Sequence, residues 1–397
     1  MVPVFPIGKN PLQSLISGVS RPDKSPIRHL TDTPPTGDTF TTPTKAQLQA
    51  LQAVSLGDDV YNESHTTIAF EKRMAELFGK EAGIFVVSGT MGNQLSIRVL
   101  LAQPPHAVLC DHRGHLINYE AGGLGLMTQA MTQSVIPSNG KYLILEDIKK
   151  VAVISDDIHA CPTKVISLEN TLGGVVMPLE EVQRVGKWAR ENGMHMHLDG
   201  ARIWNAVSNY ETMEEQLEKM KAYAKEFDTL TACFSKGIGA PVGSIIVSSQ
   251  SIINRVRHFR KAIGGGIRQA GVLTVMANAA IEEVFLAGKL RETHEKARRI
   301  AEFWVKECGG KLEHEVETNM VWLDLNHAHI GDKEFEEEAF KDGIKVLGWG
   351  RIVVHWQISD NAVKRLLKVL SGLKKRADMR IAAGEHGNGG IESGYGR

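Results

Sequence analysis

Lysine, acidic and hydroxyl side chains each follow an apolar run of this 397-residue chain, and their types fit one ligand. Lys236 follows such a run and precedes glycines, so we expect it to be enclosed, where a lysine can act as a Schiff-base nucleophile. Asp199 ends another run, and a buried carboxylate there needs a cationic partner. A further run is followed by Ser88, Gly89 and Thr90, which lead into a predicted helix. The amide groups at the N-terminus of a helix favour binding of a phosphate.

Taken together, these residues predict pyridoxal phosphate (PLP) as the cofactor, because PLP has a phosphate, a basic ring nitrogen and an aldehyde. A lysine Schiff base with an acidic partner for the ring nitrogen is its usual protein setting. Each feature has another explanation by itself, since serine and threonine also cap helices and Asp199 can cap the helix after it. His195 and His197 alternate with Asp199, but a strand rarely turns three such side chains onto one ion, so we expect no metal.

The elements that must position these residues follow an alternating pattern. Short apolar runs at 83–87, 164–168, 194–198, 230–234 and 242–247 are separated by helical patterns, which predicts βαβ units around a parallel sheet. Ligands bind outside the carboxyl ends of such strands, which is where the candidate residues occur.

The alternation of strand and helix patterns ends at about residue 270. A long helical pattern runs to about 307, and strand patterns at 318–325 and 351–357 flank an acidic helix at 333–341. We therefore predict the α/β class, with a large PLP-binding domain over 37–270 and a linker helix with a small α+β domain over 271–382. Residues 1–36 are predicted to form an N-terminal arm and 383–397 a flexible tail.

Composition excludes several classes of protein. Lys and Arg total 46, as do Asp and Glu, so an electrostatically driven nucleic-acid binder is not expected. We find no apolar run of about 18 residues, so no membrane partner is expected. The 4 cysteines lack the spacing of a disulfide framework or a metal site. The basic N-terminal arm would suit a mitochondrial presequence, but its prolines oppose the required helix, and we expect a cytoplasmic protein.

At this point the residues match a known family: the sequence resembles the L-type, low-specificity threonine aldolases, fungal members above all, from about Asp38 to about Leu370. The matching motifs are DTFTTPT (38–44), GDDVY (57–61), SGTMGN (88–93), HLINYEAGG (115–123), DDIH (156–159), LENT (168–171), LDGARIWNA (198–206), SKGIGAPVGS (235–244) and GGGIRQAG (264–271). The resemblance implies fold-type-I PLP architecture, with a mostly parallel sheet of the seven-stranded type. It also implies a homodimer or homotetramer whose subunits share active sites.

The resemblance also implies roles for particular residues. Lys236 matches the Schiff-base lysine, Asp199 the partner of the ring nitrogen, and His115 the histidine stacked on the ring near the substrate hydroxyl. The phosphate seat is matched by the SGT turn, with Ser88, Gly89 and Thr90 as cofactor-binding residues.

Substrate-binding roles are implied in the same way. Arg202, also a cofactor contact, and Arg351 match the arginines that hold the substrate carboxylate, for which a planar guanidinium is suited. His159 matches a second catalytic histidine. In the family, some residues enter the site from the neighbouring subunit or from close to it. The residues that match them here are Tyr61, Lys261 and Arg268, and Arg268 also matches a cofactor contact.

One position departs from the family, since Gly37 stands where a serine usually helps to hold the substrate carboxylate. Losing that hydroxyl donor weakens binding by about 1 kcal/mol unless water replaces it. The implied reaction is aldol cleavage of L-threonine or L-allo-threonine, a small-molecule amino acid, to glycine and acetaldehyde. Two alternatives stay open: an alanine racemase of fungal secondary metabolism on the same scaffold, and a catalytically silent relative, which Lys236, Asp199 and His115 argue against.

Overall fold

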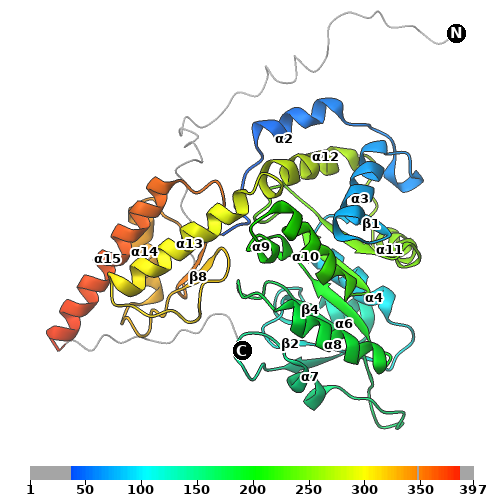
Figure 1. The fold of residues 1–397 in the computed structure, drawn as a ribbon, viewed down its shortest axis with the longest axis horizontal. Helices are drawn as coiled ribbons and strands as arrows, with labels where there is room; N and C mark the ends of the chain where they lie inside the picture. The colour runs from blue at the N-terminus through cyan, green and yellow to red at the C-terminus, as the bar shows by residue number, and fades with distance from the viewer. Residues whose placement is uncertain (1–36, 347, 385–397) are drawn as a thin grey trace, which may run out of the picture.

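The computed structural model describes residues 37–346 and 348–384, so the predicted N-terminal arm and all but the first two residues of the predicted tail lie outside the described residues. Figure 1 shows a large α/β part, which holds the main sheet, and a smaller part built from the C-terminal helices. The predicted limits of the two domains, 37–270 and 271–382, stay a prediction.

The main sheet has 7 strands in the order β1-β7-β6-β5-β4-β2-β3. The strands are β1 (Ala82–Val86), β2 (Ala107–Asp111), β3 (Met131–Val135), β4 (Thr163–Glu169), β5 (His195–Asp199), β6 (Thr229–Cys233) and β7 (Ser244–Ser248). Strands β2 to β6 pair in parallel, whereas β7 runs antiparallel to both β1 and β6. The predicted α/β class and the mostly parallel sheet are confirmed.

Helices cover both faces of this sheet. One face is packed by α3 (His65–Phe78), α8 (Leu179–Glu191) and α10 (Met213–Lys225), and the other by α4 (Gly89–Leu100) and α11 (Gln250–Ala262). Shorter elements connect them: α2 (Lys45–Ala50), η2 (Leu51–Ala53), η3 (Asp59–Tyr61), α5 (His115–Asn118), α6 (Gly123–Thr128), α7 (Leu145–Val151) and α9 (Ile203–Val207).

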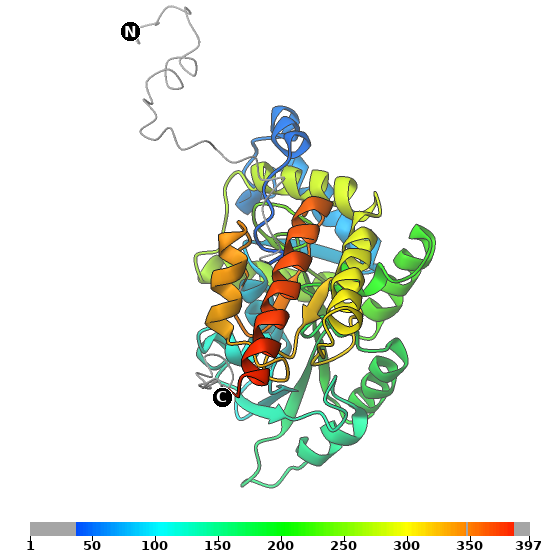
Figure 2. The same cartoon turned by 90° about the vertical axis from the view of Figure 1, so that its left-hand side faces the viewer.

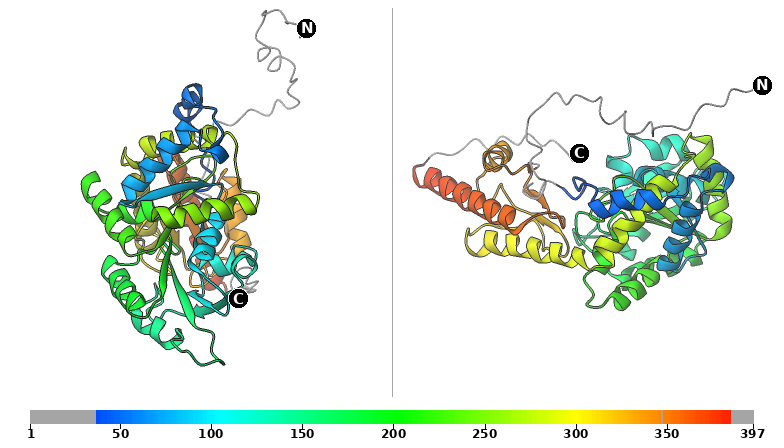
Figure 3. Two further views of the ribbon diagram at one scale, coloured as in Figure 1. Left: turned by 90° about the vertical axis from the view of Figure 1, so that its right-hand side faces the viewer. Right: turned by 90° about the horizontal axis from the view of Figure 1, so that it is seen from above.

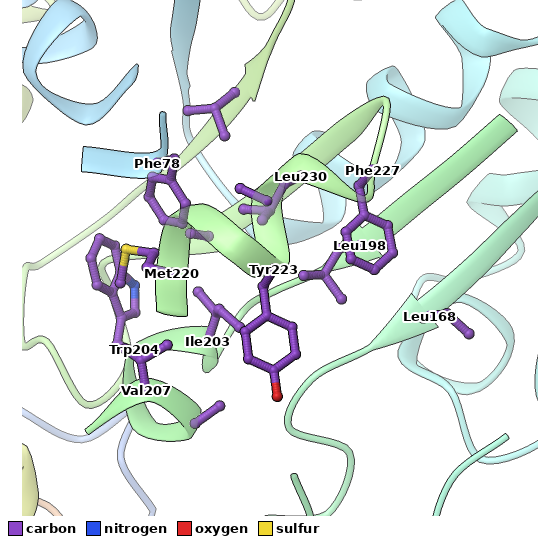
Figure 4. Close-up of a cluster of buried hydrophobic side chains, with 14 of the residues drawn as sticks. Phe78, Leu168, Leu198, Ile203, Trp204, Val207, Met220, Tyr223, Phe227 and Leu230 are labelled. Atoms are coloured by element: carbon purple, nitrogen blue, oxygen red, sulfur yellow. The ribbon is translucent and has the colours of Figure 1, made fainter. Parts of the chain in front are cut away.

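Trp204 anchors the large core, because its ring meets Phe78 edge-on at 5.3 Å and its indole nitrogen donates to the Cys233 carbonyl at 2.9 Å. Figure 4 shows this cluster, with Met220 and Tyr223 of α10 packed beside Trp204 of α9. The short helix after the site aspartate is therefore tied to the strand that precedes the site lysine.

The smaller part has its own buried core. Strands β8 (Met320–Trp322) and β9 (Arg351–Val353) form an antiparallel pair, packed with α13 (Lys289–Lys306), α14 (Asp332–Lys341) and α15 (Asp360–Ala382). Figure 2 looks onto these helices, and Figure 3 shows from above that they sit at one end of the molecule. The two predicted strands are real but are much shorter than the sequence indicates.

The long helix predicted over 270–307 is wrong as one element. The structure has α12 (Gly271–Ala280), a π-helical turn η4 (Ile281–Phe285) and then α13, with a bend of 57° between the two arms. Gly288 caps the start of α13 at φ +74°, a left-handed conformation that ends the preceding helix. No single helix in the described part of the chain is long and apolar enough to span a membrane; one pair, 271–285 with 289–306, meets the length and composition test only when combined.

Candidate active site

The candidate site lies where β4, β5 and β6 end. Glu169 and Asp199 are register partners on adjacent parallel strands, and Asp199 pairs in turn with Thr231 of β6. The Asp199 carboxylate is buried and accepts hydrogen bonds from Asn93 Nδ2 at 2.7 Å and from the Ala201 amide at 3.0 Å. The aspartate predicted to partner a ring nitrogen is therefore fixed at the carboxyl edge of the sheet.

Lys236 lies on the connection between β6 and β7, held by its backbone. Its carbonyl accepts from the Gly239 amide at 2.8 Å and from the Thr41 hydroxyl at 3.4 Å. Its ammonium group has no hydrogen bond or ion pair with any described residue. The charge of Lys236 acts on the carboxyl groups of Asp38 and Glu169 and on the ring of His115, so these groups share one site.

His115 begins α5, just beyond the end of β2. Its Nδ1 lies 2.9 Å from Glu120 Oε1, and its amide donates to Glu169 Oε2 at 2.9 Å. Burial on its own lowers the pKa of His115, but the hydrogen bond with Glu120 and the charge of Asp199 outweigh burial and raise that pKa overall. This leaves Nε2 as the ring nitrogen without a protein partner among the described residues.

His115, Glu120 and Asp199 also have the spacing of metal ligands, because their ligand atoms lie within 4.8 Å of one another. Hydrogen bonds account for this closeness, since Glu120 binds His115 while Asn93 binds both acids. His197, considered above as a possible ligand, bonds Thr229 and Asn93 instead.

The start of α4 has the features of an anion seat. Ser88 caps the helix by accepting from the Met91 amide at 3.1 Å, so its hydroxyl serves the helix. The amides of Gly89 and Thr90 and the Thr90 hydroxyl have no acceptor among the described residues. A Cβ at position 89 would lie 2.7 Å from Cys233 Sγ, so glycine lets the helix start approach the strand that leads to Lys236.

Arg202 has a partner that the sequence did not reveal. Its Nε and Nη2 donate to the two carboxylate oxygens of the buried Asp38 at 2.7 and 2.8 Å. Burial raises the pKa of Asp38, but Arg202, Lys236 and Arg351 outweigh burial and hold that pKa well below its usual range. Both N–H groups of Nη1 and the second N–H group of Nη2 are left for another ligand, and the expectation that Arg202 holds the substrate carboxylate stays a prediction.

Arg351, the first residue of β9, lacks such a partner. Its Nε is buried without an acceptor among the described residues, and its nearest polar contact is Met320 Sδ at 3.9 Å from Nη2. Its guanidinium carbon lies 5.6 Å from the centre of the Trp322 ring. Burial and the charge of Arg202 lower the pKa of Arg351, so an anion brought here would be strongly favoured.

His159 does not join this site within one chain. Its side chain is 86% exposed and bonds Asp157 Oδ1 at 2.9 Å. The loop that carries it is tied to the start of β4, where the Thr163 amide donates to the Val153 carbonyl at 3.0 Å. His159 therefore lies near the amino end of β4, the strand whose carboxyl end carries Glu169, and its catalytic role stays a prediction.

Tyr61 belongs to η3, Lys261 to the last turn of α11, and Arg268 to the segment after α11. Arg268 Nη1 donates to Asp58 Oδ2 at 2.8 Å, and its guanidinium carbon is 5.6 Å from the centre of the exposed Tyr61 ring. Lys261 is exposed at the end of α11. No hydrogen bond or ion pair of a described residue joins these three to Lys236. Their use by a neighbouring subunit stays a prediction.

Four residues of the site were missed by the sequence analysis, namely Asp38, Asn93, Glu120 and Glu169. Glu169 could have been found, since it ends a predicted strand beside Asp199. Burial and the charge of Asp199 raise the pKa of Glu169 to about 7. It lines a small cavity of about 20 Å³, the size of one water, together with His115 and Cys110.

Comparison with known proteins gives consistent results. A family model described as beta-eliminating lyase matches residues 36–328. Low-specificity L-threonine aldolase from Eremothecium gossypii is 45% identical over 334 residues, which cover 84% of this chain and 85% of that protein. Alanine racemase TOXG from Cochliobolus carbonum is 41% identical over 344 residues, which cover 85% and 86%.

Solved structures share the fold at lower identity. Threonine aldolase from Leishmania major gives a TM-score of 0.70 at 18% identity and covers 85% of this chain and 98% of that one. Serine palmitoyltransferase from S. paucimobilis with bound PLP gives 0.66 at 18%, covering 87% and 88%. The chain therefore has the fold-type-I architecture.

Proposed function

The chain belongs to the beta-eliminating lyase family, and from this premise we propose that it is a PLP-dependent threonine aldolase. It cleaves L-threonine or L-allo-threonine, which are β-hydroxy-α-amino acids, to glycine and acetaldehyde. The observation that carries the proposal is the gathering of Lys236, Asp199 and His115 at one edge of the sheet. Arg351 is close enough to Asp38 and Arg202 for their charges to act on it, and its buried Nε has no acceptor among the described residues. The Eremothecium gossypii relative, which is named for this activity, supports the choice of reaction.

The donor set of the site fits PLP. The free amides of Gly89 and Thr90 would hold its phosphate, the Asp199 carboxylate its ring nitrogen, and the unpaired ammonium of Lys236 its aldehyde. The palmitoyltransferase of the same fold, whose structure holds PLP, supports this assignment. When bound, PLP supplies an electron-accepting ring that stabilises negative charge left at Cα when a bond to Cα breaks.

The residues of the chain then divide the remaining work. Arg351, with the N–H groups of Arg202 that Asp38 does not accept, binds the substrate carboxylate and so fixes which bond to Cα is aligned for cleavage. His115 has its Nδ1 bound to Glu120, so Nε2 is the atom at which a proton can be exchanged with the substrate hydroxyl. Lys236 Nζ, which has no hydrogen bond or ion pair with a described residue, is available to return a proton to Cα.

The test is to incubate the purified protein with PLP and L-allo-threonine and to assay glycine and acetaldehyde together. We expect equimolar release of both, lost in Lys236→Ala and retained in Lys80→Ala. Lys80 is a matched control because it is also largely buried, with its ammonium bound to the Phe227 carbonyl away from the site. Absence of both products from PLP-loaded protein would rule out the aldolase proposal.

An alanine racemase is the second candidate. It is favoured by the 41% identical TOXG relative and by Gly37, which stands in place of the usual serine. Gly37 has φ +147°, a conformation that a serine rarely adopts, so the departure changes the backbone as well as a side chain. Loss of optical rotation from L-alanine, without glycine formation from L-allo-threonine, would favour this alternative.

We also propose that the enzyme works as a homodimer or homotetramer with shared sites, in the cytoplasm. Exposure of His159, Tyr61, Lys261 and Arg268 supports sharing, because a second copy of the chain can reach exposed side chains. Sedimentation of the PLP-loaded protein tests the assembly, and imaging of a tagged chain tests the location.

A further inference from the structure

Asn93 occupies the centre of a buried hydrogen-bond chain that joins both acids of the site. It lies on α4, is 1% exposed, and its Nδ2 donates to Asp199 Oδ2 at 2.7 Å and to Glu120 Oε1 at 2.8 Å. Glu120 Oε1 in turn binds His115 Nδ1. One amide group thus connects the partner of the ring nitrogen with the histidine predicted to stack on the ring.

His197 determines which way this amide faces. Its ring is wholly buried, with Nε2 3.1 Å from Asn93 Oδ1 and Nδ1 2.9 Å from Thr229 Oγ1. Because Asn93 Oδ1 can only accept, His197 Nε2 carries the proton and the Thr229 hydroxyl donates to Nδ1. Burial lowers the pKa of His197 to about 4, so a neutral ring with this single arrangement is expected near neutral pH.

The opposite orientation of the amide is strongly disfavoured. Rotating Asn93 by half a turn would place its carbonyl oxygen against both carboxylates and its NH2 group against the protonated Nε2 of His197. The acids need the donors, because the ligand atoms of His115, Glu120 and Asp199 lie within 4.8 Å of one another in a largely buried site.

We propose that Asn93 is a positioning residue for the reaction, oriented by His197, and that it fixes the Asp199 carboxylate relative to the Glu120–His115 pair. The inference rests on the proposed function for its effect on turnover, but its effect on cofactor binding is independent of the reaction. Asn93 acts through these groups and is not placed in contact with substrate.

The test compares Asn93→Leu, which keeps the size of the side chain and removes its donors, with Ser96→Ala on the same helix. Ser96 is also fully buried, but it contacts Thr231 and neither acid. We expect Asn93→Leu to lower the affinity of the cofactor-free protein for PLP and also kcat, each by about tenfold or more, with a smaller change in KM. Ser96→Ala should stay close to the unsubstituted protein in all three.

Two further variants separate the arms of the network. His197→Leu should lower the same quantities less than Asn93→Leu does, and His197→Gln, which keeps a donor toward Asn93, should restore them. In a His115→Phe background, Asn93→Leu should lose most of its effect on kcat, because that effect depends on the Glu120–His115 pair. It should keep its effect on PLP affinity, because that effect depends on Asp199.

The outcomes are distinct. The inference is overturned if folded Asn93→Leu binds PLP and turns over like Ser96→Ala, or if His197→Leu and His197→Gln behave alike. If Asn93→Leu does not fold, the comparison of His197→Leu with His197→Gln tests the inference instead. If the unsubstituted protein shows no aldol cleavage, the proposed function fails, and the PLP affinities alone still decide the role of Asn93.

Discussion

Arg202 and Arg351 carry the same charge, but their guanidinium groups have different partners. Arg202 is held by the buried Asp38 through two short hydrogen bonds, which link the start of the described chain to α9. Arg351 has a buried Nε with no acceptor among the described residues. We therefore expect Arg202 to be held in place by Asp38 and Arg351 to be the group that gains most from an incoming carboxylate.

Arg351→Lys is expected to raise KM for the amino acid by about tenfold or more, because an ammonium group cannot replace a planar pair of donors. The affinity for PLP should stay unchanged, since Arg351 comes from the small sheet. Arg190→Lys is the control, as Arg190 forms an exposed pair with Glu226. Steady-state kinetics and PLP titration measure both quantities, and an unchanged KM would contradict the assignment.

Glu169 links the site to the pH dependence of stability. Its pKa in the folded protein is about 7, raised from an ordinary value of 4.5, so the folded state holds a proton that the unfolded chain has lost between these values. The free energy of unfolding should therefore fall as pH rises from about 4.5 to 7, and change little from this cause above pH 7.

Glu169→Gln should remove this loss while keeping an acceptor for the His115 amide. We expect the variant to be more stable than the unsubstituted protein at alkaline pH, by roughly 3 kcal/mol, and to differ little from it in mild acid. Urea unfolding of the cofactor-free protein at the two pH values measures this. Equal stability gains at both would show that Glu169 does not carry the shifted proton.

At the scale of elements, the contact between α4 and β6 brings the anion seat next to the lysine. Gly92 lies on the inner side of α4, and a Cβ there would come within 2.5 Å of the methyl group of the buried Thr231. Thr231 is β-branched and part of a central strand, so it has little freedom to move aside. The glycine is needed for close packing.

Gly92→Ala should therefore destabilise the protein by about 1 to 3 kcal/mol, although alanine normally favours a helix over glycine. Gly125→Ala in α6 is the matched control, because nothing lies within 4 Å of its added Cβ. Adding Thr231→Ala to Gly92→Ala should recover most of the loss. Thermal unfolding measures all of these, and a gain in stability from Gly92→Ala alone would contradict the packing argument.

An element can be predicted from the sequence when the residues that determine it lie close together in the chain. The strand that ends at Asp199 and the strand that precedes Lys236 are short, largely buried runs and were predicted to within about two residues. Strands β2 and β3 were not predicted; β3 is an edge strand with its residues largely exposed, so its pattern is weak. The bend after α12 depends on one left-handed glycine inside an otherwise helical pattern.

The same distinction holds for the site. Side chains that follow a strand end directly, such as Lys236 and Asp199, were predicted because the sheet alone brings them together. Asp38 pairs with a residue 164 positions away, and Asn93 meets Asp199 across 106 positions, so neither contact has a local signal. His159 was placed in the site by resemblance, and only the sheet reveals that it lies at the opposite edge.

At the scale of the whole molecule, His159 gives the sharing of sites between copies a direct test. Mixing Lys236→Ala chains with His159→Ala chains should recover activity above that of either variant alone, because some sites would then receive Lys236 from one chain and His159 from the other. Exchange of subunits at increasing protein concentration, followed by glycine release, measures the recovery. Activity no greater than the summed variants would exclude a contribution of His159 across the interface.

The separate placement of β8 and β9 has a consequence for how this scaffold can diversify. Arg351 stands on a two-stranded sheet that shares its core with α13, α14 and α15, whereas Lys236, Asp199 and Asn93 belong to the main sheet and the helix packed on it. We therefore expect changes around Arg351 to alter how an incoming amino acid is oriented more than they alter the groups on the main sheet. Chimaeras that exchange the small sheet between the aldolase and racemase relatives would show whether this part of the chain decides which bond to Cα is broken.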